Sequence, residues 1–308
     1  LKCFPSACCT MPSDVFDLKI TSANPQAKVE FDYIHDDVIS PTQADGIVAY
    51  GGRNNASPEY NIWNESLNFS LSRRGQGIGT NGTDDIRWVV LKGSWKYDQM
   101  ILGTQDVSTD VNIQIYNNSN TNSPAWDLVN EVSLLTSTSG RPFDIAFEEL
   151  SGEALIVYEN STQADRFIQY ITWNGTRYSG RENISLHGQG GTERFGSNNI
   201  RYVILTPLAR TNNIMVLLHN GSGQPGGLYG INWGGDSFQQ STAMILSNWS
   251  GPSASRVVFD YAWESLTGEG IAVYGVNDSN GGMRMMLRPY SPSTFWGDEI
   301  WVANSTGA

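Results

Sequence analysis

The sequence has few of the residues on which catalytic and metal sites depend. Cysteine is absent beyond residue 9, and there are only three histidines, His35, His187 and His219, in 308 residues. No Gly-x-Ser-x-Gly, His-Glu-x-x-His or EF-hand pattern occurs. These absences argue against a nucleophilic hydrolase and against a zinc or calcium site. We therefore expect no cofactor and no metal.

Positive charge and long apolar runs are also scarce. The 19 Lys and Arg against 31 Asp and Glu give a net charge of −12, which argues against nucleic acid and anionic membranes as partners. No run approaches the ~20 apolar residues of a membrane span. The chain begins at Leu1 without a recognisable signal peptide, and we interpret this as a leader that was removed or lies outside this chain.

Turn-forming and aromatic residues are abundant. The chain has 32 glycines and 11% aromatic residues, while only 16% of its residues are charged. This mixture suits many short strands joined by polar turns and is poor for long helices. The composition predicts an all-β protein.

Glycosylation acceptors are numerous. The pattern Asn-x-Ser/Thr is more frequent than chance predicts, although Asn, Ser and Thr also meet in turns. It occurs at Asn55, Asn64, Asn68, Asn81, Asn117, Asn160, Asn174, Asn183, Asn220, Asn248, Asn277 and Asn304. We expect covalent N-glycans at several of these sites, and hence a location outside the cell, at the cell surface.

A repeat runs through most of the chain. Similar segments begin at Phe31, Ile86, Phe143, Ile200 and Phe259, which are 55, 57, 57 and 59 residues apart. Phe-Asp begins the first, third and fifth (type A), and Ile-Arg begins the second and fourth (type B), so the order is A-B-A-B-A. Fixed-period repetition of this length is typical of stacked architectures.

Each repeat has the pattern of four short strands. In the third we expect strands over 143–147, 154–158, 167–173 and 183–186, with a turn at Asn174-Gly175. Four strands in 50–60 residues is the size of a propeller blade. The sequence predicts a single β-propeller of about five four-stranded blades over 29–308, preceded by an N-terminal extension over 1–28. The expected blades are approximately 29–85, 86–142, 143–199, 200–257 and 258–308.

In repeat length and strand pattern, residues from about Phe31 to Ala308 resemble the β-propeller repeat proteins of microbial cell surfaces. The resemblance concerns architecture, since the Gly-His…Trp-Asp, kelch and Asp-box signatures are absent. It implies a propeller and no particular activity.

The N-terminal extension carries two features of its own. Cys3, Cys8 and Cys9 suggest a disulfide within or between chains, because an odd count leaves one thiol over. Residues 15–21 alternate as a strand would, with Val15, Phe16, Leu18 and Ile20 as its apolar members. That strand could pair with its own domain or, by strand addition, join a neighbouring copy head to tail into a filament.

Three other groups of residues invite a functional interpretation. Carboxylates near the ends of first strands could serve a glycoside hydrolase, and tryptophans near the ends of third strands could stack on sugars. For both groups, and for the aspartates of the Phe-Asp starts, we favour a structural role, and we expect Asp106–Asp110 to be a solvated turn. The residues are Asp36, Asp37, Glu148, Glu149 and Glu264; Trp63, Trp173 and Trp233; and Asp32, Asp144 and Asp260.

The sequence thus favours a non-enzymatic extracellular structural glycoprotein that is the repeating subunit of a surface filament joined through its N-terminal strand. The alternatives are a lectin-like propeller that binds glycans and a propeller glycoside hydrolase.

Overall fold

The structure, a computed structural model, describes most of the repeats. The described residues are 29–33, 45–51, 57–64, 68–69, 73–75, 85–97, 99–107, 110–117, 125–133, 140–161, 166–184, 200–220, 227–247, 258–277 and 283–305. Every helix or strand assigned in these ranges is a β-strand, which confirms the all-β class. No helix that could cross a membrane occurs among them. The N-terminal extension, with its cysteines and its predicted strand, lies outside the described residues.

The described strands form five antiparallel sheets, each from one stretch of chain. Sheet 1 contains β1 (Val29–Tyr33), β2 (Asp45–Tyr50), β3 (Glu59–Asn64), β4 (Asn68–Phe69) and β5 (Arg73–Arg74). Sheet 2 contains β6 (Ile86–Gly93), β7 (Gln99–Asp106), β8 (Val111–Asn117) and β9 (Ala125–Ser133). Sheet 3 contains β10 (Phe143–Phe147), β11 (Ala154–Ser161), β12 (Arg166–Trp173) and β13 (Glu182–Asn183).

Sheets 4 and 5 have the same plan. Sheet 4 contains β14 (Ile200–Pro207), β15 (Ile214–Asn220), β16 (Gly227–Trp233) and β17 (Phe238–Ser247). Sheet 5 contains β18 (Phe259–Trp263), β19 (Gly270–Asn277), β20 (Met283–Ser291), β21 (Phe295–Trp296) and β22 (Ile300–Ser305). The first strands of sheets 2 to 5 therefore begin where the sequence repeats begin.

Turn chemistry fixes the hairpins inside each repeat. Gly152 and Gly268 take φ of 77° and 74° in equivalent turns of sheets 3 and 5, a conformation that glycine adopts without strain. Gly175 does the same at 90° in the predicted Asn174-Gly175 turn. One expectation fails: the fourth strand of sheet 3 ends at Asn183, and Ile184 already lies outside it.

The cores lie between sheets, because the second strands of sheets 2 to 4 are buried on both faces. In β11, Ile156 and Tyr158 pack against sheet 2, whereas Leu155 and Val157 pack against sheet 4. We call the side of a sheet that faces the next sheet in the chain its forward face. Such stacking explains why the second strand of a repeat is nearly all apolar.

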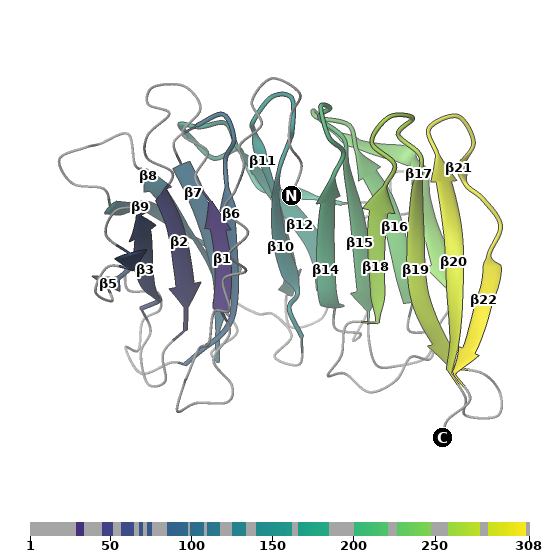
Figure 1. The fold of residues 1–308 in the computed structure, drawn as a ribbon, viewed down its shortest axis with the longest axis horizontal. Helices are drawn as coiled ribbons and strands as arrows, with labels where there is room; N and C mark the ends of the chain where they lie inside the picture. The colour runs from purple at the N-terminus through teal and green to yellow at the C-terminus, as the bar shows by residue number, and fades with distance from the viewer. Residues whose placement is uncertain are drawn as a thin grey trace.

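The sheets follow one another along the long axis of Figure 1, with sheets 1 and 2 overlapping at the left and sheet 5 at the right. Their first strands, β1, β6, β10, β14 and β18, appear in chain order along this row. The extensive contacts between described strands of different sheets join neighbours in chain order, and none joins sheet 5 to sheet 1. The described sheets therefore do not close into a ring, and a closed propeller of five blades stays a prediction.

Candidate functional site

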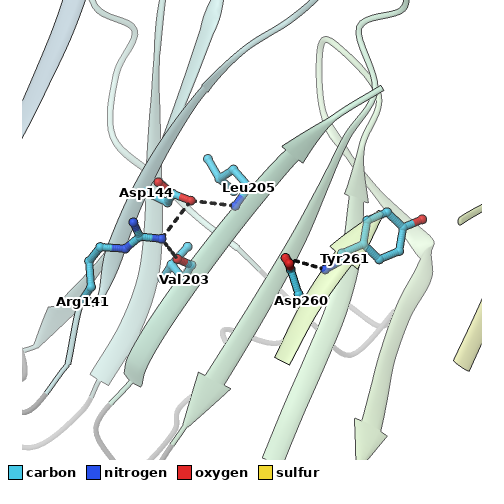
Figure 2. Close-up of polar contacts among 6 residues, drawn as sticks. All are labelled: Arg141, Asp144, Val203, Leu205, Asp260 and Tyr261. Atoms are coloured by element: carbon cyan, nitrogen blue, oxygen red, sulfur yellow. Dashed lines mark hydrogen bonds and ion pairs between the residues drawn. The ribbon is translucent and has the colours of Figure 1, made fainter. Parts of the chain in front are cut away.

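The repeated Phe-Asp aspartates have two different environments (Figure 2). Asp144 is buried on the forward face of sheet 3, where its Oδ2 accepts the backbone N–H of Leu205 of sheet 4 at 2.9 Å. Arg141 lies 3.4 Å from the same oxygen and also donates to the carbonyl oxygen of Val203 at 3.3 Å. Asp144 therefore bonds one sheet to the next, a structural role of the kind expected.

Asp260 occupies the same position in sheet 5 and is exposed. Its Oδ1 accepts the N–H of the next residue, Tyr261, at 2.8 Å, so this hydrogen bond stays within its own strand. Figure 2 shows the carboxylate of Asp260 turned to its own backbone, while that of Asp144 reaches the neighbouring strand. The side chain of Asp32 is not among those described.

Glu148, one of the carboxylates considered for glycoside hydrolysis, is buried and hydrogen-bonds sheet 3 to sheet 4. Its Oε1 accepts the indole N–H of Trp233 at 2.6 Å, and its Oε2 accepts the hydroxyl of Ser151. Burial raises the pKa of Glu148, and these two hydrogen bonds oppose that rise. A carboxylate only 2% exposed and committed to such partners does not face a substrate.

Glu264, the equivalent of Glu148 in sheet 5, is exposed and serves its own turn. Its carboxylate accepts the N–H groups of Leu266 and Thr267 and the Thr267 hydroxyl, and these bonds lower its pKa. Glu149 is half-buried next to Glu148. Asp36 and Asp37 lie outside the described residues.

The tryptophans near the ends of third strands also join sheets. Trp173 is 1% exposed and donates its indole N–H to Oε1 of Gln99 in sheet 2 at 3.0 Å, as Trp233 donates to Glu148 in sheet 3. Neither ring offers a face to a sugar. The side chain of Trp63 is not described, but the backbone places it in the same register: Gly46↔Trp63, Ala154↔Trp173 and Ile214↔Trp233 are equivalent pairs.

The forward face of sheet 5 is the surface that sequence reasoning missed. On sheet 3, Ala146, Leu155 and Ile168 are 3%, 0% and 1% exposed beneath sheet 4. At the same register positions of sheet 5, Ala262 is exposed and Ile271 and Met285 are each 42% exposed. Ile300, on the outer strand β22 opposite Leu287, is 50% exposed. Aligning the repeats could have identified these positions of the fifth repeat as counterparts of apolar positions in the third.

The glycosylation acceptors differ in access. Asn183 is exposed, and Asn117, Asn160 and Asn174 are half-buried, whereas Asn220 is 3% exposed and accepts the N–H of Gly227 at 2.5 Å. Asn174 holds its turn by accepting the Thr176 and Arg177 N–H groups. The remaining acceptors lie outside the described residues or side chains: Asn55, Asn64, Asn68, Asn81, Asn248, Asn277 and Asn304.

Two further polar residues are structural. Asp106, expected in a solvated turn, is instead fully buried, and its Oδ1 accepts the Asp110 N–H at 3.1 Å. His219 is buried in β15 with its ring 5.8 Å from that of Phe259, and burial, together with the smaller effect of the charge of Arg201, lowers its pKa to about 4. Within the described ranges, no group of three or more His, Cys, Asp and Glu could hold a metal ion.

Comparisons with known proteins identify no family. No family model matches the chain, and no curated protein matches it. Among solved structures it is similar to the six-bladed β-propeller fucose lectin of Aleuria aurantia, with 10% identity over 92% of this chain and 97% of that one, at a TM-score of 0.34.

It is also similar to the NanB sialidase of Streptococcus pneumoniae, with 12% identity and a TM-score of 0.38, over 95% of this chain and 55% of the sialidase. At such values no ligand or activity is carried over to this chain.

Proposed function

We propose that the chain is a non-enzymatic structural glycoprotein of the cell exterior that assembles with copies of itself. The observation that carries this proposal is the forward face of sheet 5. Its side chains are open to solvent, although the equivalent side chains of sheet 3 are buried beneath sheet 4. Exposed apolar side chains gathered on one face are typical of an interaction site.

The hydrogen bonds of the polar side chains support a structural role over an enzymatic one. Glu148 and Trp233 bond to each other across two sheets, and Trp173 bonds to Gln99. A glycoside hydrolase needs a pair of carboxylates flanking the scissile bond. Glu148 bonds sheet 3 to sheet 4, and Glu264 bonds within its own turn. Both roles favour the non-catalytic proposal.

The filament form of the proposal includes the N-terminal extension. A strand over 15–21 that adds to another copy would join subunits head to tail, and Cys3, Cys8 or Cys9 would lock that junction by a disulfide. The many sequons fit the same setting, since N-glycans are added to proteins that enter the secretory route.

Negative-stain electron microscopy of the full chain, secreted from a glycosylating host, tests this function. We expect filaments or other regular assemblies of the unaltered chain, and shorter or no filaments from Leu18→Asp. Single separate particles at every concentration of the unaltered chain would contradict the proposal.

Glycan binding is a second candidate, favoured by two exposed indoles. Trp95 is 42% exposed in the loop between β6 and β7, beside Lys96 and Tyr97, and Trp301 is 60% exposed on β22. Exposed aromatic faces are the platforms on which sugars stack. A glycan array with the full chain would decide the matter, because real binding should be lost in Trp95→Ala or Trp301→Ala.

A further inference from the structure

Arg201 is a buried positive charge without a counter-ion in the described part of the chain. It is the extra residue of the β-bulge in β14, where the register with β15 shifts between Ile200 and Tyr202, and it is 9% exposed. Its Nε is buried without a hydrogen-bond partner, and no described carboxylate forms an ion pair with it. Burial lowers the pKa of Arg201, because an isolated charge is costly to remove from water. Its burial therefore calls for a negative partner from outside the described residues.

The two buried carboxylates of this region have other partners. Asp144 accepts a backbone N–H of β14 at 2.9 Å and pairs with Arg141 at 3.4 Å. Glu159 is fully buried, and its Oε1 accepts the N–H of Ile200 at 3.1 Å. These two carboxylates therefore leave the charge of Arg201 uncompensated.

A second guanidinium group, that of Arg141, acts on the same place. Arg141 runs alongside the start of β14, where it forms a parallel bridge with Tyr202 and its carbonyl oxygen accepts the Val203 N–H at 3.1 Å. Figure 2 shows its guanidinium beside β14, with dashed lines to Asp144 and Val203. Burial raises the pKa of Tyr202, and the charges of Arg201 and Arg141 oppose this rise, so both guanidinium groups lie near the phenol. The side chain of Arg141 is 22% exposed, which makes the site accessible from solvent on that side.

Aromatic rings and a closely packed backbone lie next to these charges. Trp88 of β6 packs edge-to-face on Tyr202, with 6.3 Å between the ring centroids, so sheets 2 and 4 meet here. Burial and the smaller effect of the Arg201 charge lower the pKa of His219 to about 4, so this ring is neutral at pH 7. A side chain at Gly140 would collide with the carbonyl oxygen of Arg201, so glycine lets sheet 3 approach β14. Positive charge beside apolar groups attracts an anion more strongly than the same charge in water does.

We propose that Arg201, with Arg141 beside it, binds a small oxyanion, which is a carboxylate, sulfate or phosphate group. The guanidinium fork of Arg201 would donate from Nε and one Nη to two oxygens of the anion, which gives the buried Nε its acceptor. Arg141 would supply a second positive charge from the solvent side. The site is independent of the proposed self-assembly, since neither arginine lies on the forward face of sheet 5.

Thermal unfolding of the full chain at pH 7 tests the site, with sulfate, phosphate and acetate as probes. Sodium chloride holds the ionic strength constant, so that the screening of surface charges is the same in every sample. A ligand that binds only the folded state raises the melting temperature once its concentration exceeds the dissociation constant. We expect such a rise with at least one probe, and isothermal titration calorimetry should then find one site in each chain.

The variants separate this site from general salt effects. Arg201→Met removes the charge, so its affinity for the oxyanion should fall at least about tenfold. In chloride alone Arg201→Met should be at least as stable as the unaltered chain, because it removes an unpaired buried charge. Arg201→Lys keeps the charge without the fork and should bind with intermediate affinity. The matched control is Arg177→Met, at an exposed arginine in the turn after β12, which should respond like the unaltered chain.

Three results would overturn the site. One is an unaltered chain whose melting temperature no oxyanion raises above the chloride value. Another is an equal rise in Arg201→Met, which would reflect the general stabilisation of folded proteins by such salts. The third is a marked loss of stability of Arg201→Met in chloride, since Arg201 would then have a counter-charge in its own chain. A response to acetate would support a carboxylate ligand, and a response to sulfate and phosphate alone would support an inorganic one.

Discussion

The first two strands of sheets 3 and 5 have similar sequences, yet sheet 3 is covered on both faces and sheet 5 on one. Leu155 is fully buried while Ile271 is 42% exposed, and Asp144 is 4% exposed while Asp260 is open to solvent. The local structure is alike in both, down to the positive-φ glycine of the first turn. The comparison teaches that the repeat sequence specifies the sheet, whereas burial depends on whether another sheet packs against it.

The largest expected difference concerns the apolar side chains. We expect Leu155→Ala to lower the free energy of unfolding by about 2–5 kcal/mol, because it opens a cavity between sheets 3 and 4. Ile271→Ala should lower it by less than about 1 kcal/mol in the single chain, since that side chain is half-solvated. Urea unfolding at low protein concentration measures both. Equal losses would mean that sheet 5 is covered within its own chain.

The aspartates give the next contrast. Asp144→Ala leaves the buried Leu205 N–H without its acceptor and removes the partner of Arg141, which should cost about 2–3 kcal/mol. Asp260→Ala should leave the stability of the single chain nearly unchanged, because its carboxylate bonds its own backbone. The same unfolding experiment compares them, and a large loss in Asp260→Ala would contradict the open face.

The covered joint between sheets 4 and 5 should be sensitive to acid. The pKa of His219 is about 4 in the folded chain against 6.5 for an ordinary histidine, so the unfolded chain binds the proton more tightly. The neutral ring of His219 therefore contributes to the free energy of unfolding above pH 6.5. This contribution, at most about 3 kcal/mol, is lost as the pH falls towards 4. Stability measured from pH 7 to 4 should fall less steeply in His219→Gln. An unchanged slope would contradict this assignment.

The smallest effects concern the sequons. Asn183 is exposed and Asn220 is buried, so mass spectrometry of glycopeptides should find sugar at Asn183 and none at Asn220. Asn183→Gln should remove one glycan and leave stability unchanged within about 0.5 kcal/mol. Asn220→Gln should remove no glycan and cost about 1 kcal/mol, because the Gly227 N–H loses its acceptor. A glycan found at Asn220 would contradict the burial of this side chain.

Much of the fold could be predicted from local sequence. The first strands of sheets 2 to 5 begin at the repeat starts, because alternation and turn residues act over a few positions. The partners of Glu148 and Trp233 could not be predicted, since they are 85 residues apart and meet only when sheets stack. The burial of Asp106 could not be predicted for a related reason: an acidic turn looks solvated until the neighbouring strands are known to cover it.

The central claim is that the chain assembles with copies of itself through the forward face of sheet 5. Energy transfer between separately labelled chains tests this claim most directly. One sample carries a donor dye at Leu266 and the other an acceptor at Arg74, both exposed in the single chain. The account predicts transfer on mixing, abolished by Ile271→Asp in the donor chain, and little transfer inside one doubly labelled chain at high dilution. Strong transfer within the diluted chain, and none between chains, would contradict it.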